Sequence, residues 1–176
     1  FLSGPFYRLF QNELANNGFS PVISDKPFAS VFPDKTGVKV YQDNDKTNDQ
    51  FKKLSLKDYN AWEQLKEDYD EFTPELLPLM EMELPSLKAA TQLIKLYRKL
   101  KFKKAVDLAS FLAQSPREFV EKTFENEKTR ALFTPWAFHL DYAPDVSAGA
   151  IFPLIEVISN QRNGMGVAKG GISNMI

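Results

Sequence analysis

The sequence predicts an α+β fold that is mainly helical, with a small antiparallel sheet near its N-terminal end. Helices are predicted because apolar residues recur every three or four positions over long stretches. The sheet is predicted from two short segments, 26–32 and 37–43, on either side of the turn sequence PDKTG. No repeat or long linker divides the 176 residues, which suffice for one sizeable core. We therefore expect residues 1–176 to form a single domain.

The first predicted element is a helix over residues 3–18. Ser3 is a suitable N-cap, Pro5 suits the first turn, and Gly18 suits the end of the helix. Its apolar face carries Phe6, Leu9, Phe10 and Leu14.

The predicted strand pair follows. Val38 and Val40 alternate with polar neighbours, as in a strand with one solvent-exposed face. One further strand is expected near the C-terminus.

Most of the remaining chain is predicted to be helical. A short helix over 45–54 precedes a longer one, for which Ser55 and Asp58 form a start resembling a capping box. Thr73 and Pro74 are expected to begin a new helix. The apolar face of the longer helix carries Tyr59, Trp62, Leu65, Tyr69 and Phe72.

Three serines mark further helix starts. Ser86 opens a helix that continues, after a short break, through residues 103–114. Ser115 begins the sequence SPRE, which places a cap, a proline at the first helical position and an acid at the third. Ser147 is expected to cap the last helix. The apolar side of the helix after Ser86 carries Leu87, Ala90, Leu93, Ile94, Tyr97 and Leu100.

Composition argues against several classes of function. The formal net charge is −1 and the isoelectric point is about 5.9, whereas nucleic acid binding needs a basic surface. The chain has no cysteine and one histidine, so thiol chemistry and multi-histidine metal sites are excluded, and no metal is expected. No apolar run approaches the roughly 18 residues of a membrane span. We expect a cytoplasmic protein.

A basic segment allows two further interpretations. Residues 95–104, KLYRKLKFKK, hold six cations among four apolar residues. They can contact an anionic membrane surface, which would make the protein membrane-peripheral. They can also pair with the stretch from Glu63 to Glu83, which carries eight carboxylates. Because charge runs usually form solvated helix faces, the solvated face is preferred over membrane contact.

The glycine-rich end of the chain, NGMGVAKGG, does not fit a dinucleotide-binding loop. The GxGxxG fingerprint requires a glycine where this chain has Lys169. The preceding ISNQRN is polar, whereas the fingerprint follows a buried strand. A tight turn at Gly170 and Gly171 is therefore expected.

The segment TPWAFHLDYAPD contains the candidate site residues Trp136, Phe138 and His139. A histidine that acts as a general base needs an orienting group, and Asp141 and Asp145 are nearby in sequence. On local chemistry alone, His139 reads as a structural histidine at a helix end, where the dipole favours its cation. Core packing is likewise the simpler reading of both aromatic residues.

Taken together, these segments resemble the middle, substrate-facing region of phytoene dehydrogenase-related oxidoreductases, which are flavoproteins of the wider amine-oxidase-like group. That region shows a serine-capped helix, an aromatic-His-x-x-x-x-Pro-Asp segment, and a Pro/Lys-Gly-Gly turn that leads back into the FAD-binding domain. This chain departs from the pattern at Asp141, where glycine is frequent, and at Ala168, where proline is common. The matching positions are Ser115, Phe138-His139 with Pro144-Asp145, and Lys169-Gly170-Gly171.

The resemblance implies that the chain is a substrate-binding domain excised from a larger FAD-binding fold. The FAD-binding domain would lie outside residues 1–176, and the isolated fragment would be inactive. An apolar substrate would lie next to the flavin, against a cavity wall that includes Trp136, Phe138 and His139. Gly170 and Gly171 would form a flavin-proximal turn. No catalytic residue is assigned. The alternative is a free-standing helical module that docks a protein partner through an aromatic groove.

Overall fold

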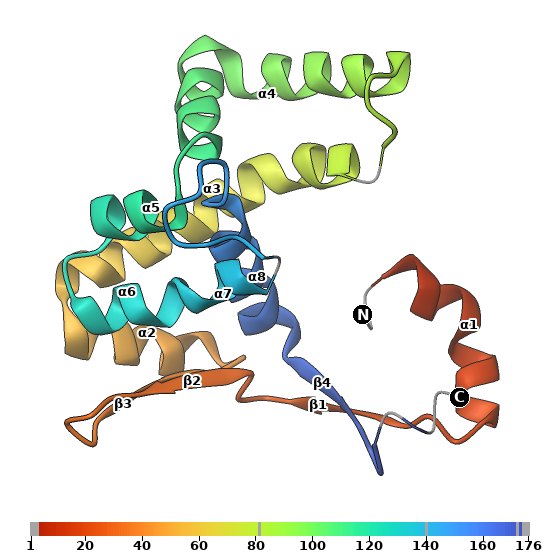
Figure 1. The fold of residues 1–176 in the computed structure, drawn as a ribbon, viewed down its shortest axis with the longest axis vertical. Helices are drawn as coiled ribbons and strands as arrows, with labels where there is room; N and C mark the ends of the chain where they lie inside the picture. The colour runs from red at the N-terminus through yellow and green to blue at the C-terminus, as the bar shows by residue number, and fades with distance from the viewer. Residues whose placement is uncertain (1–3, 81, 140, 172, 174–176) are drawn as a thin grey trace.

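The computed structural model describes residues 4–80, 82–139, 141–171 and 173. This part of the chain is mainly helical with two small antiparallel sheets, which confirms the predicted α+β class. A helical hairpin projects from one end of the helical body, and a two-stranded ribbon projects from the other (Figure 1). In chain order the elements are α1 (Pro5–Asn16), β1 (Pro21–Ser24), β2 (Phe28–Val31), β3 (Gly37–Val40), α2 (Asn44–Leu54), α3 (Leu56–Met80), α4 (Leu87–Leu112), α5 (Pro116–Thr123), α6 (Glu127–Phe133), α7 (Pro135–Phe138), α8 (Ile151–Asn163) and β4 (Met165–Ala168).

Both sheets consist of two antiparallel strands. β2 pairs with β3 around the predicted PDKTG turn. β1 pairs with β4, with Ser24 opposite Met165 near the body and Pro21 opposite Ala168 at the outer end. The sequence does not predict β1, because the strand is short and its partner lies at the other end of the chain.

The predicted N-terminal helix is confirmed as α1, although its expected cap at Ser3 lies outside the described residues. Gly18 has a φ of 87°, in the left-handed region that favours glycine after a helix. Of the predicted apolar face, Leu14 is buried, whereas Leu9 and Phe10 are exposed. Most of this face therefore lies outside the core.

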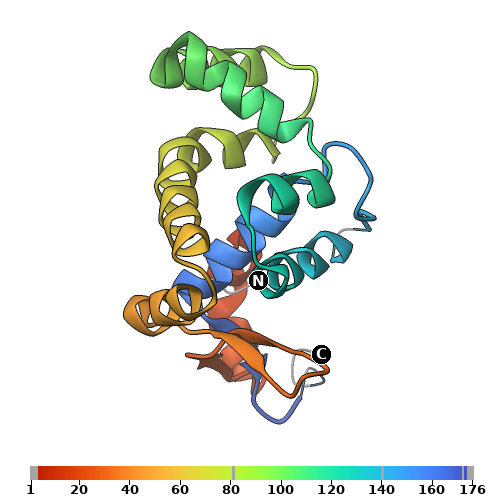
Figure 2. The ribbon, with the colours of Figure 1, turned by 90° about the vertical axis from the view of Figure 1, so that its left-hand side faces the viewer.

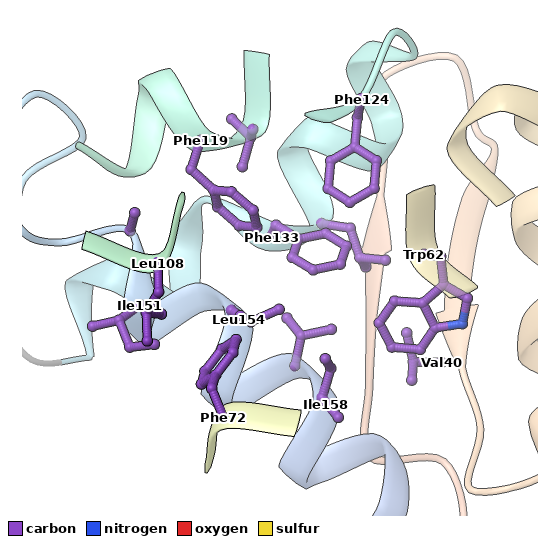
Figure 3. Packing of buried hydrophobic residues seen from close by; sticks show 14 of the residues in the cluster. Val40, Trp62, Phe72, Leu108, Phe119, Phe124, Phe133, Ile151, Leu154 and Ile158 are labelled. Carbon is purple, nitrogen blue, oxygen red and sulfur yellow. The ribbon is translucent and has the colours of Figure 1, made fainter. Parts of the chain in front are cut away.

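Aromatic side chains form the centre of the core (Figure 3). Phe51 and Trp62 stack with ring centroids 5.0 Å apart and an interplanar angle of 9°. Phe133 contacts both of these rings, and its centroid lies 4.7 Å from that of Phe124. All four side chains are at most 1% exposed. Their burial joins α2, α3 and α6 into one body.

Two of the predicted helix caps are confirmed. The Ser86 hydroxyl accepts a hydrogen bond from the Ala89 N–H at 3.1 Å. At the start of α5, Ser115 and Glu118 form the complete capping box, with reciprocal hydrogen bonds of 3.2 and 2.9 Å. These bonds satisfy N–H groups that the first helical turn leaves without partners.

The prediction that Ser147 caps the last helix is wrong. α8 begins at Ile151, after Ala150, which provides no side-chain cap. The segment before it is held instead by backbone bonds, in which the N–H groups of Ala148 and Ala150 donate to the carbonyls of Ala113 and Gln114. These contacts with the end of α4 delay the start of the helix.

The prediction of a new helix at Thr73 and Pro74 is also wrong, because α3 continues through Pro74 and Pro78. A proline inside a helix removes an N–H donor. The Thr73 hydroxyl donates to the carbonyl of Tyr69 at 2.5 Å, and α3 packs against α2, α4 and α8. Tertiary packing therefore outweighs the local tendency of proline to end the helix.

Asp58 links the start of α3 to the segment between α5 and α6. The Ser55 hydroxyl accepts a hydrogen bond from the Asp58 N–H at 3.2 Å, as predicted. The Asp58 carboxylate accepts hydrogen bonds from the N–H groups of Glu125 and Asn126 at 2.8 and 3.2 Å. Asp58 is fully buried, so these donors compensate a charge removed from water.

α3 and α4 form the projecting helical hairpin (Figures 1 and 2). α4 changes direction at Lys101, which has a φ of 62° and a ψ of 173°. Residues 87–100 form the first part of α4, and residues 102–112 form the second. In the first part, Ala89, Leu96 and Leu100 are buried. The apolar side predicted from the sequence is mostly exposed, including Leu87, Leu93, Ile94 and Tyr97.

Candidate functional site

A mainly apolar cavity lies between α3, α4, α5 and α8. Its volume is about 360 Å³, at the lower end of the range for small-molecule sites. Four of the helices each provide one or more apolar lining residues, among them Phe72, Leu108, Phe119 and Leu154 (Figure 3). The complete apolar lining is Leu65, Phe72, Leu100, Leu108, Phe111, Phe119 and Leu154.

Helix periodicity places these side chains on a common wall. Leu65 and Phe72 are seven residues apart on α3, and Leu108 and Phe111 are three apart on α4, so each pair shares a helix face. The capping box at Ser115 fixes the start of α5, which carries Phe119. The rings of Phe111 and Phe119 meet at 5.3 Å in a T-shaped pair. The wall is therefore held by packing on several sides.

Charged side chains also line the cavity. Lys104 of α4 donates to both carboxylate oxygens of Glu71 of α3, at 2.7 and 2.5 Å. This hydrogen bonding with Glu71 raises the pKa of Lys104. The other charged lining residues are Asp68, Asp107 and Lys122.

The residues that line this cavity can bind a ligand. Its apolar lining can desolvate a ligand, and its polar groups are carboxylates, amines, one amide and one hydroxyl. Within the described residues, no group of three or more His, Asp or Glu side chains is placed to hold a metal ion. Among the described lining residues, the arrangement shows no evident nucleophile activated by a base.

The predicted site residues Trp136, Phe138 and His139 lie on or next to α7 and do not line this cavity. The Trp136 ring packs on Phe28 of β2 in a T-shaped pair with a centroid distance of 4.8 Å. The His139 ring lies 6.5 Å from that of Trp136, and Phe138 is 53% exposed. The structure therefore brings Trp136 and His139 together beside β2. Their part in a substrate site stays a prediction.

A second, smaller hollow lies next to this aromatic pair. It has a volume of about 300 Å³ and shares Phe28 with the Trp136 contact. Its lining residues are Lys26, Phe28, Ala29, Lys39 and Tyr41. None of the α7 aromatic residues lines this hollow, and Trp136 contacts only its Phe28.

His139 has a carboxylate partner that the sequence does not reveal. Its Nδ1 lies 3.5 Å from Oε1 of Glu156 on α8. Asp145, one of the two carboxylates considered from sequence, is paired with Arg117 at 2.5 Å. The other, Asp141, has a φ of 61° in the turn after α7. Glu156 was missed because only the packing of α7 on α8 brings it near His139.

A third hollow, of about 440 Å³, is polar, and four of its five charged lining residues form two ion pairs, Lys66 with Glu63 and Arg162 with Asp70. Lys66 is nearly buried, donates to Asn44 at 2.9 Å, and lies 2.8 Å from Glu63. Arg162 pairs with Asp70 and lowers the pKa of that carboxyl group. These contacts join α3 to α2 and to α8, so Lys66, Asp70 and Arg162 have a structural role.

The C-terminal glycines lie at the end of α8 and in the turn after β4. Gly164 ends α8 with a φ of 70°, the following residues form β4, and Gly170 and Gly171 form the expected turn with φ values of 79° and 103°. Among the described residues the order is helix, strand and turn, whereas a dinucleotide site has strand, turn and helix. Figures 1 and 2 show this end of β4 pointing away from α7.

None of the helices in the described part of the chain combines the length and apolarity needed to cross a bilayer. Comparisons of the chain with protein-family models, with curated proteins and with solved structures give no match.

Proposed function

We propose that the chain is a substrate-binding domain of an FAD-dependent oxidoreductase and that it encloses an apolar substrate. The observation that carries this proposal is the cavity between α3, α4, α5 and α8, with its apolar walls. Burying an apolar ligand there is favourable by about 25 cal/mol for each Å² removed from water. The role of this chain is to bind the substrate and exclude water. The flavin, held by residues outside this chain, supplies the redox chemistry.

The ribbon of β1 and β4 supports the idea of a domain inserted into a larger one. Its two strands keep the segments that lead to and from the helical body side by side. Beyond the strands, the Lys169 N–H donates to the carbonyl of Ser20 at 2.9 Å. An inserted domain needs two adjacent connections of this kind, and the proposed partner is the FAD-binding domain of the same polypeptide.

In this proposal, α7 supplies a second apolar surface for the substrate. α7 packs against α8, which also provides Leu154 to the cavity wall. Trp136 and Phe138 supply the apolar surface, and the His139 ring lies 3.5 Å from the Glu156 carboxylate.

The proposal is tested by titrating the 176-residue chain with N-phenyl-1-naphthylamine, an apolar dye whose fluorescence rises on leaving water. We expect saturable binding of one dye per chain. Replacing Thr123 by Trp places a large side chain at the cavity lining and should weaken dye binding at least tenfold. Thr91→Trp, on the exposed surface of α4, is the matched control and should bind as the wild type does.

Circular dichroism of both variants separates a blocked cavity from a loss of folding. A folded Thr123→Trp variant that binds the dye as tightly as the wild type would overturn the proposal. So would an absence of saturable binding by the wild type.

A further inference from the structure

The first part of α4 carries an exposed apolar surface, which we name the α4 stripe. It consists of Leu87, Leu93, Ile94 and Tyr97, which are 89%, 52%, 53% and 52% exposed. Their spacing places them on one side of the helix. The core uses a neighbouring face, where Ala89, Leu96 and Leu100 are buried toward α3. The stripe is therefore not part of the core.

Positive charge adjoins the stripe. Residues 87–106 contain seven cations and no carboxylate. Two of the cations pair with α3, since Lys99 lies 3.9 Å from Glu75 and Lys104 lies 2.5 Å from Glu71. The other five are exposed and form no ion pair with another described residue: Lys88, Lys95, Arg98, Lys101 and Lys103.

The position of the stripe makes it accessible to a flat surface. Figures 1 and 2 show the first part of α4 at one end of the molecule, with the β1–β4 ribbon at the other. Phe102, immediately after the bend at Lys101, is 71% exposed. A planar partner can therefore meet this end of the molecule without touching the ribbon.

We propose that the α4 stripe docks on an anionic lipid bilayer. Aliphatic and aromatic side chains can enter the boundary between headgroups and acyl chains, while the adjoining lysines and arginine contact anionic headgroups. Long basic side chains suit this arrangement because their stems lie along apolar groups and their charges reach the polar layer. The excess of positive charge favours a negatively charged surface over a neutral one. The inference is independent of the proposed oxidoreductase function.

Vesicle flotation tests this docking directly. The 176-residue chain is mixed with vesicles of phosphatidylcholine and phosphatidylserine, or of phosphatidylcholine alone, and centrifuged through a density gradient. We expect the chain to float with the anionic vesicles, to stay behind with the neutral ones, and to dissociate as salt is raised. Each of these results measures how much electrostatic attraction contributes to vesicle binding.

Two sets of variants separate the charge from the apolar contact. Changing Lys95, Arg98, Lys101 and Lys103 to Gln should reduce flotation at least tenfold. Changing Leu93, Ile94 and Tyr97 to Ser should also reduce it, although every charge remains. A matched control removes four exposed lysines elsewhere, and it should float as the wild type does: Lys35, Lys39, Lys52 and Lys53.

Tyr97→Trp gives a readout of depth, because tryptophan emission shifts to shorter wavelength when the indole leaves water. We expect that shift with anionic vesicles only, measured against the wild-type spectrum of Trp62 and Trp136. Equal flotation with neutral vesicles, or undiminished flotation of the folded four-Gln variant, would overturn the proposal. A folded chain that never floats would overturn it too, and would leave the stripe as a surface for an acidic protein.

Discussion

The carboxylate of Asp58 accepts a hydrogen bond of 2.8 Å from the backbone N–H of Glu125, which joins the start of α3 to the loop between α5 and α6. The same carboxylate accepts a second bond, from the N–H of Asn126. Asp58 is fully buried, so the two N–H donors compensate a carboxylate removed from water. One side chain thus fixes two parts of the helical body that are distant in sequence.

Replacing Asp58 by Ala is expected to lower the free energy of unfolding by about 3 kcal/mol, since two backbone donors then lose a charged acceptor. Urea unfolding followed by circular dichroism measures the loss. Asp49→Ala, at an exposed position of α2, is the matched control and should change stability by less than about 0.5 kcal/mol. Equal effects of the two replacements would show that the Asp58 bonds contribute nothing.

Replacing Phe133 by Ala removes the ring that contacts Phe51, Trp62, Phe119 and Phe124. We expect a loss of about 4 kcal/mol, because the site is fully buried and the neighbouring rings cannot fill the cavity.

The same change at Phe138, which is 53% exposed, should cost less than about 1 kcal/mol. Thermal unfolding of the two variants measures this contrast. A large loss at Phe138 would mean that its ring packs more closely than its exposure indicates.

The hydrogen bond from Lys128, together with bonds from Thr36, lowers the pKa of Asp34 from 3.8 to about 2. A carboxyl group with a lowered pKa in the folded state stabilises the fold above its unfolded pKa, and this contribution is lost as the pH falls. We expect Asp34→Asn to lower the urea midpoint at neutral pH. That difference should shrink as the pH falls from 3.8 toward 2. A difference between the two proteins that does not depend on pH in this interval would contradict the assignment.

The chain is expected not to bind FAD tightly, because its glycine-rich end has Lys169 where the dinucleotide fingerprint requires a glycine. Mixing the chain with FAD should leave the flavin fluorescence unchanged. Stoichiometric quenching would contradict both this reading and the proposal that the flavin is held elsewhere. Riboflavin, which lacks the pyrophosphate, is the control for non-specific stacking on exposed aromatic rings.

Signals that act within a few residues were enough to predict much of the fold. The caps at Ser86 and Ser115, the turn between β2 and β3, and the end of α1 before Gly18 all depend on neighbouring residues. Features that depend on distant packing were not predictable. β1 needs β4 as its partner, and α3 continues past Pro74 because other helices pack along it.

In the candidate site, too, features set by neighbouring residues were predictable and features set by distant packing were not. Periodicity predicts that Phe72 and Phe119 lie on apolar helix faces, but it cannot show that four such faces leave a cavity between them. The partnership of His139 with Glu156 likewise depends on the packing of α7 against α8. In α4, the predicted apolar side mixes the buried Leu100 with the exposed Tyr97, because one helix can carry two apolar faces.

The pairing of β1 with β4 also determines how the molecule would respond to tension. Force applied to the two flanking segments acts first at the bond between Lys169 and Ser20, and then at Pro21 and Ala168, the outer end of the ribbon. The inter-strand bonds would then break one after another, as in a zipper, and not all together in shear. A pull on the two connections would therefore separate β1 from β4 at low force. The ribbon would open before any load reached the aromatic core.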